Sequence, residues 1–290
     1  MKLDRTALSD WVHKEFKVER DVLGKAGIED LLERGRVWDL AGTLNAGGAV
    51  VFPHAGLPVC GHQIAAAVHA TLDSGAEQVL VIGVLHALSD ELEDARVRVA
   101  NGTDVTQEPS WGIQGPGLDT GDDWRHEFSL SNFLFLWVEE TKRRGIPGPE
   151  LILRFPYLAG GRPMILPGIT ELQNIVQDAV VVSTADPFHH GIGYGESPET
   201  ALHPEQGGLD LARQRIAEGL EILGMGDYWG YNQHCVSAKS DARDAGQIMR
   251  YLLGPLQGEI LDLTYQDTSA MYDQPPPTWV ATALIDMRPG

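Results

Sequence analysis

Residues 48–84 read GAVVFPHAGLPVCGHQIAAAVHATLDSGAEQVLVIGV, and this segment decides the fold class. It opens on a short apolar run rich in β-branched residues, 48–53, which is typical of a strand buried on both faces. An alanine-rich helix is expected over 61–75, ending at Gly75. A second buried strand is expected over 78–84. A strand, a helix and another strand in this order indicate an α/β protein with a largely parallel sheet.

The same alternation continues through the rest of the chain. Further strands are expected at 150–157, 179–184, 258–267 and 278–287, and further helices at 129–145, 170–179, 209–224 and 238–254. The pattern predicts a single α/β sandwich whose central, mixed but largely parallel sheet is flanked by helices. Segment 1–45 is charged and has helical spacing, so we expect an N-terminal helical cap on a metal-binding α/β catalytic domain, 46–290, the two forming one compact unit.

The composition excludes several classes of partner. Of the 290 residues, 22 are Lys or Arg and 41 are Asp or Glu, which gives a formal net charge of −19. A surface this negative repels nucleic-acid phosphates and anionic lipid, so neither nucleic acid nor a membrane is expected as a partner. The charged start, the two cysteines and the absence of a long apolar run predict a soluble, cytoplasmic protein. Assembly into a homo-oligomer stays open.

Several polar side chains directly follow predicted strands. His54 follows the first strand, His86 the second, and Asp186 and His189 follow the strand at 179–184. In open α/β sheets, ligands bind just beyond the carboxyl ends of the strands. Imidazole is the commonest metal ligand near neutral pH, so His54 and His86 are predicted metal ligands. The alternative for each is a histidine packed against the following helix.

Cys235 is the third candidate ligand. It lies in YNQHCVSAK, just before a predicted helix, and a helix N-terminus lowers the pKa of a thiol. Thiolate is a good ligand for iron, copper and zinc. A buried, inert cysteine is the usual fate of a free thiol, and on local grounds this alternative is the stronger one.

Acid–base chemistry is predicted for three further residues. Asp186 and His189 have i, i+3 spacing in a glycine-rich loop, and a carboxylate beside an imidazole makes a good proton-transfer pair. An Asx-type turn with an exposed histidine is the alternative. His126 precedes a helix among acidic neighbours that would keep it protonated, so it could donate a proton, or it could be a solvated histidine.

Several segments resemble one family. FPHAGLPVCG, 52–61, resembles the PHAG-x-x-x-CG signature of the Memo family. Segments that resemble the family's other motifs follow in the expected order, at 79–87, 180–191, 232–237 and 269–285. The sequence departs from the family at Ala87, where a second adjacent histidine is expected, and at 236–238, where Val-Ser-Ala replaces Gly-Arg-His.

The Memo family shares its fold with class III extradiol dioxygenases. The resemblance implies a metal held by His54 and His86, with Cys235 at the position of the dioxygenases' glutamate ligand. It also places His126 and His189 on the dioxygenases' two catalytic histidines. It thus implies a mononuclear non-heme dioxygenase, with Fe(II) favoured and copper or zinc possible, that acts with O2 on a small chelating substrate such as a catechol or aminophenol.

Two other functions are compatible with the same residues. A Memo-like protein could hold iron or copper for redox or signalling without ring-cleavage turnover. A zinc hydrolase could use Asp186 as a general base toward a metal-bound water.

Overall fold

The structure is a computed structural model, and it describes residues 5–290. Within these residues, eight strands form one mixed sheet. The strands are β1 (Ala49–Phe52), β2 (Gln78–Ile82), β3 (Gly112–Gln114), β4 (Glu150–Tyr157), β5 (Ala179–Thr184), β6 (Phe188–Gly191), β7 (Leu256–Asp267) and β8 (Thr278–Pro289). Their order is β3-β4-β2-β5-β1-β8-β6, and β7 pairs with β8.

The centre of the sheet is parallel and its edges are antiparallel. β4, β2, β5 and β1 run parallel to one another. β3 joins antiparallel at one end, and β8 joins β1 antiparallel at the other, followed by β6 and β7. The predicted α/β class with a mixed, largely parallel sheet is therefore confirmed.

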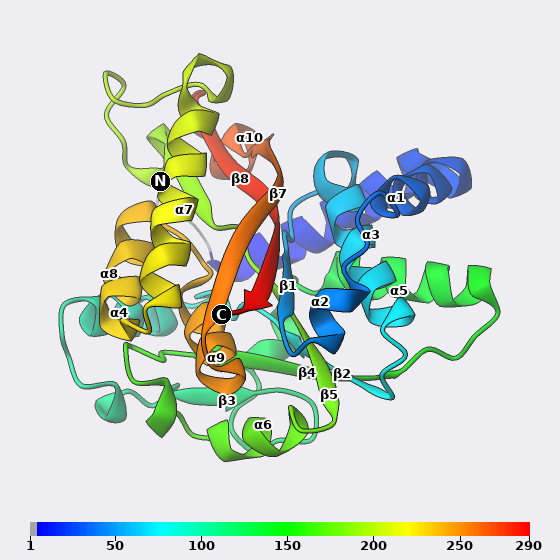
Figure 1. Ribbon diagram of the computed structural model, residues 1–290. Coiled ribbons are helices and arrows are strands. Elements are labelled where there is room, and N and C mark those ends of the chain that lie inside the picture. The colour runs from blue at the N-terminus through cyan, green and yellow to red at the C-terminus, as the bar shows by residue number, and fades with distance from the viewer. Residues whose placement is uncertain (1–4) are drawn as a thin grey trace.

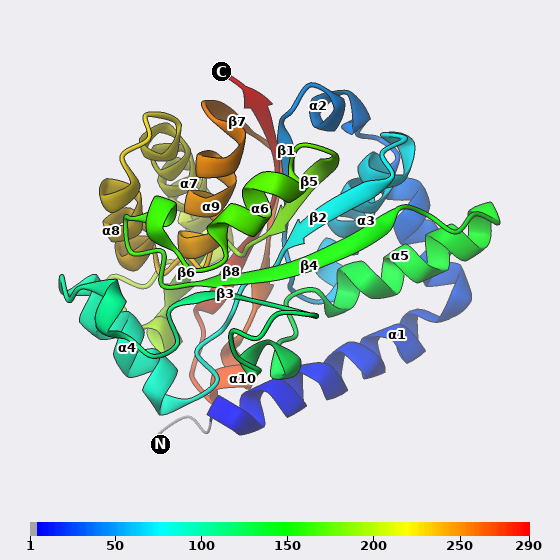
Figure 2. The same ribbon diagram turned by 90° about the horizontal axis from the view of Figure 1, so that it is seen from below.

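Helices cover both faces of the sheet. They are α1 (Arg5–Gly35), α2 (Ala41–Asn45), α3 (Leu57–Asp73), α4 (Asp90–Ala100), α5 (Ser131–Arg144), α6 (Ile169–Ile175), α7 (Gly208–Gly224), α8 (Tyr228–Ala238), α9 (Arg243–Leu253) and α10 (Ser269–Tyr272). Helices α2, α3 and α5 lie on one face and α6, α7 and α9 on the other, with α1 outside α3 and α5 (Figures 1 and 2). None of the helices within residues 5–290 is long and apolar enough to cross a membrane.

The β1 strand shows why the sheet is buried on both sides. Val50 and Phe52 point into the hydrophobic core beneath α3 and α5. Ala49 and Val51 point into the second core, beneath α7 and α9. Successive side chains of a strand alternate between faces, so a continuous apolar run is what a strand between two helical layers requires.

The N-terminal segment is helical and packs on α3. Ile28, Leu31 and Leu32 of α1 are buried in the same core as the apolar side chains of α3. Gly35 brings the two helices into close contact, because a Cβ there would lie 2.6 Å from the Cβ of Ala65. The segment predicted as a cap thus contributes to the main core. Its residues 1–4 lie outside the described residues.

Some elements differ from those predicted. The helix expected at 238–254 is α9, which begins at Arg243, and a separate helix, α8, precedes it. The buried face of α8 includes the polar residue Asn232, so its apolar residues do not follow a helical period. The glycine-rich loop expected after β5 contains the short strand β6, which pairs with β8.

Candidate metal centre

Three parallel strands bring the predicted site residues to one edge of the sheet. In the strand register, Phe52 of β1 is paired with Thr184 of β5, and Ile82 of β2 with Ser183. The three strands therefore end level with one another. His54 follows β1 by two residues and His86 follows β2 by four, and their ring centroids lie 5.1 Å apart. The predicted convergence of the two histidines is present.

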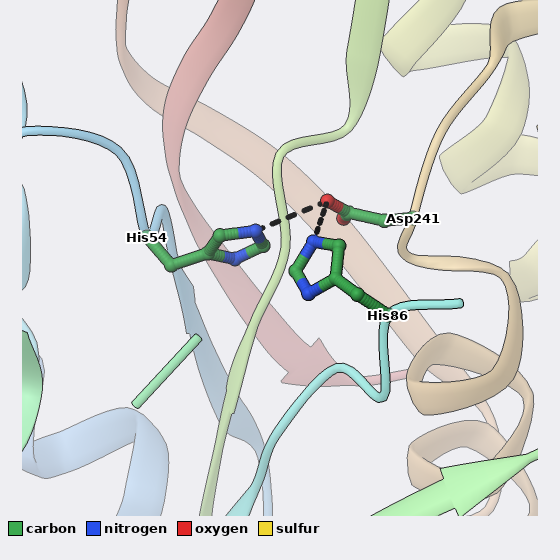
Figure 3. Close-up of side chains that lie close together, drawn as sticks. All are labelled: His54, His86 and Asp241. Atoms are coloured by element: carbon green, nitrogen blue, oxygen red, sulfur yellow. Dashed lines mark ion pairs between the residues drawn. The ribbon is translucent and has the colours of Figure 1, made fainter. Parts of the chain in front are cut away.

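Asp241 joins the two histidines. Its Oδ2 lies 3.2 Å from Nε2 of His54 and 3.9 Å from Nε2 of His86 (Figure 3). It comes from the short loop between α8 and α9, on the opposite helical layer from α3. One ligand atom from each of the three residues can be chosen so that all lie within 4.8 Å of one another, which is close enough to hold a metal ion.

Thr184 fixes which nitrogen of His54 faces Asp241. The Thr184 hydroxyl donates its one hydrogen to the carbonyl of Phe52, at 2.9 Å. It therefore accepts from Nδ1 of His54, which lies 3.1 Å from the same oxygen. With the proton on Nδ1, the neutral ring has its lone pair on Nε2, the atom that faces Asp241.

Glu127 fixes which nitrogen of His86 faces Asp241. Its Oε1 lies 2.9 Å from Nδ1 of His86, and its Oε2 accepts the backbone N–H of the same residue at 2.6 Å. Phe128 stacks on the His86 ring with the centroids 4.4 Å apart. Burial would raise the pKa of Glu127, but these bonds to His86 hold it below its usual value. A carboxylate behind a histidine is the arrangement that orients metal-ligating imidazoles and raises their basicity.

The charges around the three residues favour a cation. Burial opposes protonation of His54, but the carboxylates of Asp186 and Asp241 raise its pKa to about 9. Burial also raises the pKa of Asp186, assisted by the neighbouring charge of Asp241. The Oδ2 atom of Asp241 is buried, and its polar neighbours are the Nε2 atoms of His54 and His86, at 3.2 and 3.9 Å. A buried carboxylate oxygen that faces two imidazole nitrogens fits a divalent metal ion, which would take the place of the His54 proton.

Cys235 does not belong to this group. It lies in the second half of α8 and not before a helix, and its side chain is buried in the apolar core beneath α7 and α9. Burial raises the pKa of its thiol to about 12, which disfavours the thiolate that a metal would need. Asp241 is the third member of the group in place of the predicted Cys235. The surroundings of Cys235 agree with the stronger local alternative, a buried and inert cysteine.

His126 is also absent from the group. It ends a short 3-10 turn and its side chain is exposed to solvent. The next residue, Glu127, has the buried position beside His86. The segment that was predicted to supply a proton donor therefore supplies a carboxylate that orients a predicted ligand.

Asp186 and His189 lie near the centre but do not form the predicted pair. Asp186 faces His54: its Oδ1 accepts the His54 backbone N–H at 3.2 Å, and its backbone N–H donates to Asp241 at 2.8 Å. His189 lies on β6 and its ring packs edge-on against Tyr194. Burial lowers the pKa of His189 to about 4, while the charge of Asp241 opposes this shift. Its Nδ1 is buried without a hydrogen-bond partner in the described chain.

Asp241, Glu127 and Thr184 are site residues that the sequence did not single out. Asp241 is one of 41 acidic residues and follows no strand, so its local sequence carries no signal. Thr184 is the last residue of a predicted strand, and Glu127 is one of the acidic neighbours of His126 in the sequence. No model of a known protein family matches the chain, and no curated protein sequence matches it either.

Proposed function

We propose that this protein is a metal-dependent oxidoreductase of the dioxygenase type. His54, His86 and Asp241 would hold Fe(II), and the substrate would be a small chelating molecule such as a catechol or an aminophenol. One observation supports this most directly: two Nε2 atoms and one carboxylate oxygen converge at the sheet edge. Two histidines and one carboxylate with open positions are typical of non-heme Fe(II) oxygenases.

The carboxylate strengthens the iron assignment over Cu(I). Cu(I) prefers soft thiolate and thioether ligands, and Asp241 offers a hard oxygen. Zinc also accepts two histidines and a carboxylate, so a zinc hydrolase stays the competing proposal. Asp186 is the general base that this alternative needs, but its carboxylate already accepts the His54 backbone N–H and lies 3.7 Å from His54 Nε2. Because this carboxylate is engaged with a ligand, the redox proposal is favoured.

The surrounding residues would prepare the centre and move a proton. Fe(II), when bound, would supply the path for electrons between a chelated substrate and O2. Thr184 and Glu127 would keep both imidazoles in the ligating tautomer. His189 is neutral at physiological pH because burial lowers its pKa to about 4, and its buried Nδ1 is free to accept the proton of a substrate hydroxyl.

Metal analysis tests the ligand set first. Protein purified without oxygen should contain iron, and His54→Ala, His86→Ala and Asp241→Asn should each lose it because each removes one of three ligands. Cys235→Ser is the matched control and should keep its metal. Iron content that falls in Cys235→Ser and persists in Asp241→Asn would restore the thiolate site and contradict this ligand set.

Turnover tests the reaction. The iron-loaded protein should consume O2 with a catechol or an aminophenol, and the zinc-loaded protein should not. Metal-dependent ester hydrolysis by the zinc form, without O2 uptake by the iron form, would favour the hydrolase instead.

A further inference from the structure

A small cavity lies between the sheet and the helices α7, α8 and α9. Its volume is about 40 Å³, and most of the residues that line it are buried. Apolar side chains dominate the wall, among them Ile216 and Leu223 of α7, Met249 of α9 and Ile285 of β8. One water molecule needs roughly 10–15 Å³, so the cavity has space for a molecule of two or three heavy atoms.

The polar groups of the cavity wall already have partners within the protein. The Ser183 hydroxyl donates to the carbonyl of Ile82 at 3.3 Å, and the Ser240 hydroxyl accepts the backbone N–H of Ala242 at 3.2 Å. The buried side-chain nitrogen and oxygen atoms that lack a partner in the described chain all belong to residues outside the wall. A bound water needs two to four polar partners, so this cavity suits a small apolar molecule better than water.

The cavity and the candidate metal centre share a wall. Ala185 and Ser240 line the cavity, and the next residue after each, Asp186 and Asp241, belongs to the centre or its immediate surroundings. The backbone N–H of Asp186 donates to Oδ1 of Asp241 at 2.8 Å, so the two chain segments lie side by side. Only these two segments, with the small side chains Ala185 and Ser240, are needed to separate the cavity from the centre.

The centre is open to solvent on a different side. The His86 side chain is 21% exposed, while the side chains of His54 and Asp241 are almost fully buried. A chelating substrate that comes from solvent would therefore reach the centre beside His86. A molecule held in the cavity would reach it from the side of Asp241.

We propose that this cavity binds O2 and supplies it to the metal centre. The inference rests on the proposed function and adds a site for its second substrate. O2 has two atoms and no charge, and like other apolar molecules it favours an apolar environment over water. A binding site within the core keeps O2 beside the metal without competing for the opening that the chelating substrate uses.

O2 itself is the probe for the cavity, because it is paramagnetic and speeds the relaxation of nearby nuclei. Methyl relaxation is compared in metal-free protein under O2 and under the same pressure of N2. The methyl groups of Met249 and Ile285 should show an effect about threefold or more above that of Ile248, which is fully buried in the same core but does not line the cavity. Equal effects at all three residues would overturn the inference.

A cavity-filling variant and a matched control locate the bound O2. Ala245→Val adds two methyl groups at the cavity wall and should abolish the excess relaxation at Met249. Ala212→Val makes the same change at a buried alanine of the same core that does not line the cavity, and it should keep the excess. Ile216→Phe fills the cavity from α7 and is the second variant should Ala245→Val not fold. Excess relaxation that persists in the folded filled variants would contradict O2 binding in this cavity.

Oxygen kinetics tests the supply of O2 to the metal. In the iron-loaded protein with catechol, Ala245→Val and Ile216→Phe should raise the KM for O2 about threefold or more, while iron content and kcat at saturating O2 are kept. An unchanged KM for O2 in both variants would overturn the supply role. If the iron-loaded wild type consumes no O2, the proposed function fails, and the relaxation measurement still decides whether the cavity binds O2.

Discussion

At the scale of single residues, the two histidines are set for metal binding by the partners of their Nδ1 atoms. Thr184→Val removes the acceptor of the His54 Nδ1–H but keeps the shape of the side chain. We expect metal affinity to fall about tenfold, the lower end of the usual effect for such partners. Competition with a chelator of known affinity measures it. Thr141→Val, whose hydroxyl bonds the backbone within α5, is the control, and equal losses in both variants would contradict the tautomer argument.

Cys235 should be indifferent to the metal. Its thiol is buried and its pKa is raised to about 12, so little thiolate exists at pH 8 in either state. The alkylation rate, followed by mass spectrometry of the peptide that contains Cys235, should be equal with and without metal. It should rise only in denaturant. Protection of this cysteine by metal would identify it as a ligand.

A site residue could be predicted from the sequence where it directly follows a recognisable strand. His54 and His86 could be identified because each follows a recognisable buried strand, and ligands gather at the carboxyl ends of such strands. Asp241 could not, because it follows a helix with a mixed pattern and is one of many acidic residues. The sequence pattern favoured Cys235 instead, which lies six residues away on the buried face of α8.

At the scale of elements, one buried carboxylate joins the helices on the α3 side of the sheet. Glu140 of α5 is fully buried, and it bonds Arg143 and Arg144 of its own helix and Arg36, just after α1. Burial would raise its pKa, but the bonds to Arg143 and Arg144 outweigh that and hold the pKa below 4.5.

The lowered pKa of Glu140 gives a pH dependence with a definite sign. The unfolded chain takes up this proton at higher pH than the folded protein, so the stabilisation is complete well above pH 4.5 and disappears as the pH falls through the folded pKa. Glu140→Gln should cost about 3 kcal/mol at pH 7 and much less at pH 3. Urea unfolding at both pH values measures the difference. An equal cost at both would show that the ion pairs contribute nothing.

Helices and strands could be predicted where the apolar residues of a segment follow one clear pattern. The strands β1, β2 and β5 are buried on both faces, so each is a short, continuous apolar run with little competing interpretation. α8 and β6 lack such a signal, since α8 buries Asn232 and β6 consists of the residues FHHG. Both are formed by tertiary packing rather than by local preference, and both lie close to the candidate site.

At the scale of the whole molecule, the candidate centre connects the two helical layers. His54 and His86 come from loops at the strand ends, while Asp241 comes from the loop between α8 and α9. The sequence could show that these strand ends exist, but it could not show that β5 lies between β1 and β2 or that the α8–α9 loop reaches them. Such placement depends on contacts far apart in the chain.

A centre that bridges both layers should couple metal binding to global stability. An ion that binds only the folded state adds stability according to its excess over Kd, about 2.7 kcal/mol at one hundred times Kd. For a chain of 290 residues this corresponds to a rise in the unfolding temperature of about 4 °C. Fe(II) added without oxygen should produce this rise in the wild type and in Cys235→Ser, and none in Asp241→Asn.

The comparison of metal-free proteins completes this test. Asp241→Asn removes the carboxylate that lies 3.2 Å from His54 Nε2 and whose pKa, despite burial, this contact lowers to about 2. The metal-free variant should therefore be less stable than the wild type. The Fe(II)-dependent rise is measured within each folded protein, as the difference between its metal-loaded and metal-free forms. Loss of the metal-dependent rise would then reflect the missing ligand and not a damaged fold. If instead Fe(II) stabilises Asp241→Asn as much as the wild type, the ion binds elsewhere, and the His54–His86–Asp241 group is an ion-pair network rather than a metal centre.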